Sequence, residues 1–99
     1  MLRHVVLFKW ADSATPEARA AACKRIADLA PLFPALARFE LGQDARIRDG
    51  MYDAVLVADF PDVDTYRTYV THPDHVDVIA DIAPIVAQKA SIQHYLEAP

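Results

Sequence analysis

The sequence predicts an α+β fold in which helices cover one face of a four-stranded antiparallel sheet. The chain has 99 residues, which is enough for one domain and too few for two. Runs rich in β-branched and aromatic residues alternate with amphipathic stretches in the order strand, helix, strand, strand, helix, helix, strand. In a chain of this length that order is the split βαβ, or ferredoxin-like, arrangement (β-α-β-β-α-α-β). We therefore expect residues 1–99 to form a single domain of this type.

The N-terminal part of the chain predicts a strand and a helix. The strand is expected in "HVVLFKW", residues 4–10, which is β-branched and aromatic. Thr15 followed by Pro16 is typical of a helix start, because the first helical position needs no N–H donor. Pro31 is expected to close this helix. One face of the strand would carry His4, Val6, Phe8 and Trp10, and the buried stripe of the helix would carry Ala18, Ala22, Ile26 and Leu29.

The third strand, residues 52–60, is apolar on both faces. It follows a second strand that ends at Gly42 and a turn signalled by the pair Asp49-Gly50. A sheet with helices on one face must expose its other face or pair it with something. One side of the third strand carries Val55 and Val57, and the other carries Ala54, Leu56 and Ala58. We therefore expect a homodimer in which the open sheet faces meet and close a dimeric α+β barrel.

The C-terminal half predicts two helical stretches and a last strand. Asp62 or Asp64 can cap the first of these helices, and Pro73 ends it because the residue before a proline avoids the helical region. Residues 74–90 are interpreted as the second helical stretch, in which a proline predicts a break. Residues 91–97 alternate and predict the last strand.

Composition and charge exclude several classes of function. The net charge is −4 and no basic stretch offsets it, which argues against nucleic acid or an anionic membrane as a partner. The N-terminal apolar run is too short and too charged for a signal peptide or a membrane span. We therefore expect a cytoplasmic protein. Cys23 is the only cysteine, so no internal disulfide can form. The sequence has no glycine-rich phosphate loop and no serine or cysteine nucleophile with an identifiable base.

The stretch "YVTHPDHVDV", residues 69–78, contains residues suited to proton transfer. A neutral imidazole has a pKa of about 6.5, so His75 can accept a proton near neutral pH. Tyr69 can donate a hydrogen bond to the enolate oxygen that forms when a carbonyl compound loses its α-proton. We predict His75 as the base, Tyr69 as the oxyanion donor and His4 as a polar group that orients the substrate. The alternative for His4 and His75 is structural, since a histidine beside an apolar run needs a hydrogen-bond partner anyway.

Two further histidines are assigned structural roles, and no metal is expected. His72 precedes Pro73, where its imidazole can bond the last free carbonyls of the preceding helix. His94 is expected to be a cross-strand surface partner. The spacing of His72 and His75 does not match the i, i+4 pair of a helical zinc site, and the proline interrupts the helix between them. We expect no cofactor, and a weak magnesium site at a helix end is the remaining alternative.

Three segments resemble the stress-responsive A/B barrel (Dabb) domain family of the dimeric α+β barrel superfamily. They are "HVVLFKW", "YDAVLVADF" and above all "YVTHPDHV". The resemblance runs from Arg3 to about Leu96. It implies a homodimer in which the open sheet faces meet, and a cavity between the sheet and the helices of each subunit.

One plant branch of that family, the olivetolic acid cyclases, closes a linear polyketide by aldol condensation. The tyrosine–histidine pair of the branch falls on Tyr69 and His75, and its strand-one histidine falls on His4. The chain departs from the branch at Ala54 and His94, where the branch has a histidine and an aspartate. The resemblance therefore implies a similar cavity used for a different substrate.

Three interpretations of function remain open. The first is a protein that binds an apolar small molecule, as a cofactor-free cyclase, isomerase or lyase that uses His75 and Tyr69 in acid–base chemistry on a carbonyl compound. The second is a non-catalytic structural stress protein whose role is its oligomer. The third and weaker one is a cofactor-free monooxygenase-like barrel. An open cavity that reaches His75 favours the first interpretation, whereas a closed one favours the second.

Overall fold

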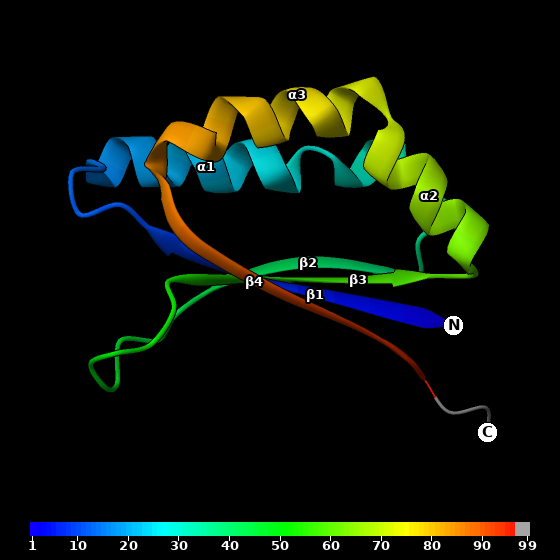
Figure 1. Cartoon of the computed structure of the whole chain (residues 1–99), viewed down its shortest axis with the longest axis horizontal. Coiled ribbons are helices and arrows are strands. Elements are labelled where there is room, and N and C mark those ends of the chain that lie inside the picture. The colour runs from blue at the N-terminus through cyan, green and yellow to red at the C-terminus, as the bar shows by residue number, and fades with distance from the viewer. Residues whose placement is uncertain (97–99) are drawn as a thin grey trace.

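Four strands form one antiparallel sheet in the order β2-β3-β1-β4 in the computed structural model, which describes residues 1–96. Three α-helices lie on one face of this sheet (Figure 1). The strands are β1 (Leu2–Trp10), β2 (Arg38–Gln43), β3 (Ala54–Phe60) and β4 (Val86–Tyr95), and the helices are α1 (Pro16–Ala27), α2 (Val63–Thr71) and α3 (Pro73–Ile82). Short 3-10 turns follow α1 at Ala30–Leu32 and α3 at Ala83–Ile85. The predicted ferredoxin-like α+β fold is confirmed.

Alternation along β1 and β3 separates a covered sheet face from an open one. The helix-facing residues of both strands are buried except for His4, which is half-buried. The covered side consists of Val6, Phe8 and Trp10 from β1 and Ala54, Leu56, Ala58 and Phe60 from β3. The open side carries Val5 and Leu7 opposite Val57 and Val55, all of them half-buried. The faces predicted from alternation are therefore confirmed, and the apolar open face has no covering element within residues 1–96.

The helices begin at the residues that their capping chemistry predicts. Thr15 accepts a hydrogen bond from the N–H of Ala18 at 3.0 Å, and Pro16 takes the first position of α1. Of the two aspartates that could cap α2, Asp62 does so by accepting from the N–H of Thr65 at 2.7 Å. In the predicted stripe Ala22 and Ile26 of α1 are buried and Ala18 is half-buried, and Leu29 is buried just beyond the end of the helix at Ala27.

The last strand begins at Val86, five residues before the predicted start at residue 91. Residues 87–90, for which the sequence predicts a helix, are all good helix formers, so propensity alone favours a helix there. Pairing of β4 with β1 overrides that preference. The two strands pair with a β-bulge, because Lys9 lies opposite Gln88 while Trp10 lies opposite Val86.

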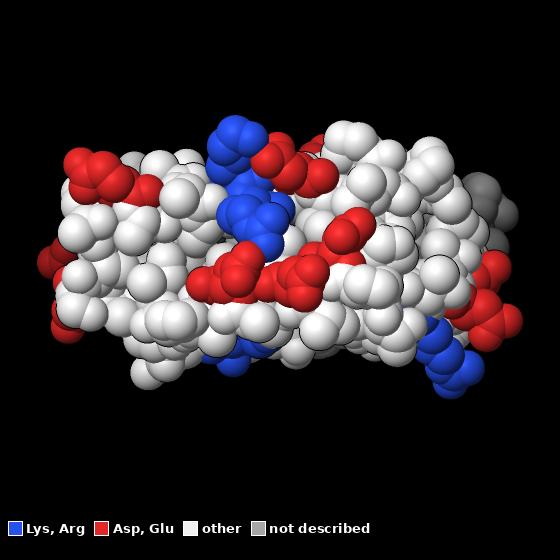
Figure 2. Space-filling view, turned by 90° about the horizontal axis from the view of Figure 1, so that it is seen from above, with Lys and Arg blue, Asp and Glu red and all other residues white. Residues whose placement is uncertain are grey.

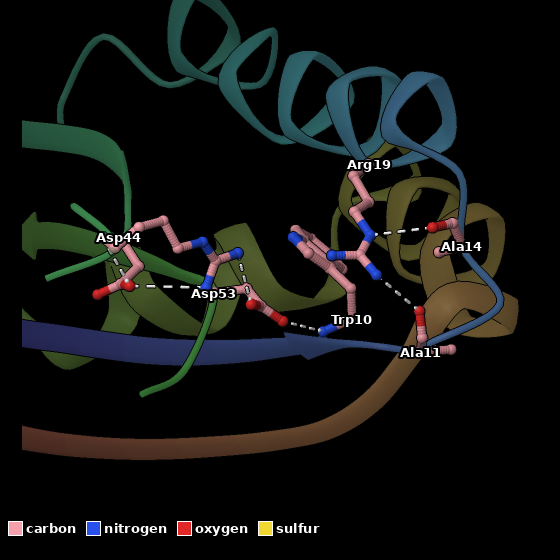
Figure 3. A network of polar contacts seen from close by, with 7 residues as sticks. Trp10, Ala11, Ala14, Arg19, Asp44 and Asp53 are labelled. Atoms are coloured by element: carbon pink, nitrogen blue, oxygen red, sulfur yellow. Dashed lines mark hydrogen bonds and ion pairs between the residues drawn. The ribbon is translucent and has the colours of Figure 1, made fainter. Parts of the chain in front are cut away.

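Buried Asp53 ties the connection between β2 and β3 to the end of β1. Its carboxylate accepts from the backbone N–H of Trp10 and from the guanidinium of Arg46, both at 2.7 Å (Figure 3). Arg46 has a positive φ of 57°, and Asp44 stabilises that backbone by accepting from the N–H of Arg46. Arg19 of α1 donates to two carbonyls of the segment that follows β1 (Figure 3). These bonds fix the C-terminal end of β1, at Trp10 and Ala11.

The outer surface of the helical layer has mixed charge. Figure 2 shows basic side chains flanked by acidic ones on this face. Arg25 of α1 forms an ion pair with Asp81 of α3, and Lys24 pairs with Asp28 along α1. None of the helices in residues 1–96 has the length and apolar character that crossing a membrane would require.

Candidate active site

A cavity of about 240 Å³ lies between the sheet and the helices. All three residues predicted to be catalytic line it: His4 comes from β1, Tyr69 from α2 and His75 from α3. Tyr66, Lys89 and Ser91 supply the other polar side chains. The apolar lining consists of Val6, Phe8, Ile26, Leu29, Leu56, Val70, Val78 and Ile79. The cavity thus places a few polar groups against a mainly apolar wall, which is typical of small-molecule sites.

His75 has a defined tautomer. Its Nδ1 lies 3.0 Å from the carbonyl oxygen of Val70, which belongs to the last turn of α2. A carbonyl oxygen only accepts hydrogen bonds, so in the neutral ring Nδ1 carries the proton and Nε2 has a free lone pair. Burial lowers the pKa of His75, and the bond to Val70 opposes that shift only in part. The ring is therefore neutral at pH 7 and can act as a base through Nε2.

Tyr69 packs directly beside His75. Their ring centroids are 4.5 Å apart, and the ring of Tyr69 also packs against Phe33, edge to face, and against Phe60 in a tilted arrangement. Only 2% of Tyr69 is exposed, and burial raises its pKa to about 12. The hydroxyl therefore stays protonated across the physiological range and can donate a hydrogen bond to a developing oxyanion.

His4 has the opposite tautomer. The side-chain amide nitrogen of Gln93 lies 3.1 Å from Nδ1 of His4. An amide N–H donates, so Nδ1 accepts and the proton of the neutral ring is on Nε2. Burial lowers the pKa of His4, and the charges of His75 and Lys89 lower it further. His4 therefore offers an N–H donor to the site, whereas His75 offers a lone pair.

The predicted role of His72 is wrong. We expected its imidazole to bond the last carbonyls of α2, but its Nδ1 accepts from the N–H of Asp74 at 3.1 Å and caps the start of α3. Pro73 holds His72 in an extended conformation (φ −62°, ψ 136°) that directs the side chain to the following helix. The expected bond to a carbonyl at the end of α2 is made instead by His75, through Val70.

The two positions at which the chain departs from the cyclase branch lie outside the cavity. His94 is exposed and lies opposite Arg3 on the open face, so it is a cross-strand surface residue as predicted. Ala54 is buried in the core under the helices. Neither is among the lining residues. Within residues 1–96, no three or more histidine, cysteine, aspartate or glutamate side chains gather where they could hold a metal ion.

Two polar residues of the cavity, Lys89 and Ser91, are not predicted from the sequence. The reason is the misplaced start of the last strand, which put Lys89 in a helix. With β4 beginning at Val86, alternation along the strand identifies both residues. The register sets Lys89 beside Phe8 and Ser91 beside Val6, on the side of the sheet that faces the helices.

Comparison with known proteins places the chain in a family. The model of the stress responsive A/B barrel domain (Dabb) matches residues 2–94. A dimeric ferredoxin-like protein of unknown function from Thermobifida fusca is 35% identical, with a TM-score of 0.88 over 96% of this chain and 90% of that one.

Two more distant structures share the fold. A Dabb family protein with a ferredoxin-like fold from Mesorhizobium loti is 20% identical, with a TM-score of 0.81 over 98% of this chain and 97% of that one. A hydroxynitrile lyase from Passiflora edulis is 12% identical, with a TM-score of 0.85 over 99% of this chain and 94% of that one. No curated protein matches the chain. The match of the family model over nearly the whole sequence shows that this chain belongs to the stress-responsive A/B barrel (Dabb) family.

Proposed function

We propose that the cavity binds a small, largely apolar carbonyl compound and that His75 removes a proton from the carbon next to its carbonyl without a cofactor. The observation that carries the proposal is the bond from His75 Nδ1 to the carbonyl of Val70. It keeps the proton on one ring nitrogen and leaves the other as a base, in a ring that lines the cavity. Cyclases, isomerases and lyases that act through an enolate share this step.

The proposed step needs only a proton acceptor and hydrogen-bond donors, which the side chains of the cavity supply. Nε2 of His75 takes the α-proton, and the electron pair of the broken C–H bond moves to the carbonyl oxygen to give an enolate. The hydroxyl of Tyr69 and the Nε2–H of His4 donate hydrogen bonds to that oxygen. The enolate then attacks a second carbonyl through its carbon, eliminates a leaving group from the next carbon or is reprotonated, and His75 returns its proton to the alkoxide, to the leaving group or to the carbon. Positioned proton transfer of this kind contributes about 10²- to 10⁴-fold in rate.

The open sheet face is the proposed contact between two copies of the chain. Ile92 on β4 is 63% exposed and lies opposite Val5, whose other neighbour in the sheet is Val57. A contiguous apolar face of this kind usually marks an interaction surface. The dimeric state of the protein from Thermobifida fusca supports this assembly. On this proposal residues 1–99 form one A/B barrel unit per subunit, and the cytoplasmic location expected from the sequence stays a prediction.

The competing interpretation is a non-catalytic protein whose role is its oligomer. The bond between His75 and a backbone carbonyl fits it, since a purely structural histidine would be satisfied in that way. The cavity favours ligand binding instead. Side chains do not fill the space beside His75, Tyr69 and His4, and a structural core has no need of two histidines with opposite tautomers around an empty volume.

Hydrogen exchange at carbon tests the proposal. Aryl alkyl ketones lose their α-protons slowly in neutral buffer, so enzyme-dependent deuterium incorporation from D2O can be followed by NMR. We expect the wild-type chain to accelerate exchange and His75→Gln to abolish the acceleration. His72→Asn is the matched control, because it removes the neighbouring histidine but keeps a helix cap. Equal exchange by the wild type and His75→Gln would contradict the proposal.

A further inference from the structure

The side of β4 that faces the helices is polar from Lys89 to Gln93, whereas the apolar residues of this stretch lie on its other side. Lys89, Ser91 and Gln93 lie beside Phe8, Val6 and His4 of β1, on the covered side of the sheet. Ala90 and Ile92 lie on the open side. A strand that only completed the core would place its apolar residues under the helices. The polar side of β4 instead forms one wall of the cavity, to which Lys89 and Ser91 contribute directly.

Lys89 gives the cavity a positive charge that no acidic residue balances. The lining contains no aspartate or glutamate, and Lys89 is its only lysine or arginine. The ion pairs formed within residues 1–96 do not include Lys89. The two histidines of the lining are neutral at pH 7, since burial lowers the pKa of both. A cation beside an apolar cavity attracts an anion into it.

The size and lining of the cavity restrict the kind of anion. A volume of about 240 Å³ corresponds to roughly eight water molecules at ~30 Å³ each, which is close to the space that an aromatic ring with a short side chain needs. The apolar wall opposite Lys89 disfavours a ligand that is polar all round. Phosphate groups are usually bound by several backbone N–H groups or a helix N-terminus, and a single ammonium group fits a monoanion better.

We propose that the ligand is a small apolar keto acid and that Lys89 binds its carboxylate. Lys89 also lines a second hollow of about 220 Å³, which has Phe8 and Ile79 in common with the cavity. Lys89 therefore lies at the border between the cavity and this hollow. A carboxylate held there leaves the apolar body and the ketone of the ligand in the cavity with His75, Tyr69 and His4. The inference rests on the proposed function for the role of the ketone, but the pairing of carboxylate and Lys89 is independent of catalysis.

A matched pair of ligands tests the pairing. β-Benzoylpropionate and its primary amide have the same size and differ by one charge, and their affinities can be measured by calorimetry at neutral pH. We expect the wild type to bind the acid about tenfold more tightly than the amide, a difference of about 1.4 kcal/mol. Lys89→Met should remove this preference without weakening the binding of the amide, and Lys89→Arg should keep most of it.

Lys24→Met is the control for net charge, because it removes the same charge from an exposed site on the outside of α1. It should keep the full preference for the acid. Added salt should weaken binding of the acid more than that of the amide. The inference is overturned if Lys89→Met still prefers the acid, if the wild type binds acid and amide equally, or if it binds neither.

The same samples separate this inference from the proposed function. Deuterium incorporation next to the ketone of the bound acid reports on His75, whereas the ratio of the two affinities reports on Lys89. A preference for the acid that depends on Lys89, without deuterium incorporation, would contradict the proposed function and support the inference. Incorporation that depends on His75, without a preference for the acid, would support the proposed function and overturn the inference.

Discussion

The rings of Tyr69 and His75 have their centroids 4.5 Å apart, although the two residues belong to different helices. One residue, His72, ends α2 through its backbone and caps α3 through its side chain. This break turns the chain between the two residues and leaves the carbonyl of Val70 free for His75. In an uninterrupted helix, positions six residues apart would lie on different faces. The break at His72 and Pro73 is therefore what brings the proposed base and the proposed oxyanion donor together.

The stability of the protein should decrease as the pH falls from about 7.5 to about 5.5. Burial lowers the pKa of His4 and of His75 in the folded chain, while the unfolded chain keeps the ordinary value of about 6.5. The unfolded chain therefore binds more protons below that value, and the free energy of unfolding falls with pH until both folded histidines titrate. This window lies above the ordinary range of aspartates, about 3.9. Urea unfolding at several pH values measures the effect.

Two variants test whether His4 and His75 cause this pH dependence. One combines His4→Gln with His75→Gln, and the other is His72→Asn alone. The double variant should show a flatter dependence on pH, and the variant at His72, which lies outside the cavity lining, should keep the slope of the wild type. An unchanged slope in the double variant would mean that other groups cause the dependence.

Tyr69→Phe should slow deuterium exchange by about 10²- to 10³-fold, the usual loss when one oxyanion donor is removed. The substitution keeps the ring that packs against Phe33 and Phe60, so the melting temperature should change little. Tyr66→Phe is the comparison, since Tyr66 also lines the cavity but lies beside His4 rather than His75. Exchange rates from NMR decide the matter, and an equal loss in both variants would remove the specific role of Tyr69.

Asp59→Asn should lower the free energy of unfolding by about 1–3 kcal/mol, because it breaks a hydrogen-bonded ion pair on the open face. The carboxylate is 5% exposed and accepts two bonds of 2.8 Å from the guanidinium of Arg3. These bonds hold the pKa of Asp59 below its usual range, so the stabilisation is present above about pH 4 and is lost as the pH falls further. Urea unfolding at neutral pH measures the change.

Asp64→Asn is the control for this prediction. Its carboxylate is almost fully exposed and lies 3.7 Å from Arg67, a surface pair that contributes about 0–1 kcal/mol. If Asp64→Asn destabilised the protein as much as Asp59→Asn, the buried position of Asp59 would not explain the effect.

Ile92→Lys should prevent the proposed dimer from forming, because it places a charge on the apolar open face of the sheet. Val76→Lys, a similar change at an exposed position of α3, should leave the assembly unchanged. Sedimentation velocity of the two variants and the wild type measures the masses. A dimer that persists in Ile92→Lys but not in Val76→Lys would place the contact on the helices instead of the sheet.

Local chemistry made much of the fold predictable. The cap at Thr15 and the alternation that puts His4 and Val6 on one face of β1 depend on neighbouring residues only, and both are present as expected. The start of β4 depends on its distant partner β1, so the helix-forming residues before Ser91 gave a wrong assignment. Because of that wrong assignment, the sequence did not predict that Lys89 lines the cavity.

The candidate site was predictable as a set of residues but not as chemistry. His4, Tyr69 and His75 do line one cavity. Their protonation depends on two contacts that no sequence pattern specifies, namely Val70 beside His75 and Gln93 beside His4. The second of these joins residues 89 positions apart in the chain. Each contact requires the folded sheet and the broken helix to exist first.

The β-bulge at the start of β4 sets the phase of the whole strand. With Ala87 as the extra residue, odd-numbered positions from Lys89 onward face the cavity and even-numbered positions face outward. Pairing the same residues without the bulge would set Gln88 opposite Phe8 and exchange the two sets, since a strand alternates with period two. Lys89, Ser91 and Gln93 would then face outward, and Ala90 and Ile92 would face the cavity. Deleting Ala87 would instead remove the bulge and keep Lys89 opposite Phe8, because the bulge absorbs the one extra residue. Ligand choice and subunit contact therefore depend on one alternation of side chains along β4, and the bulge holds that alternation in phase with β1.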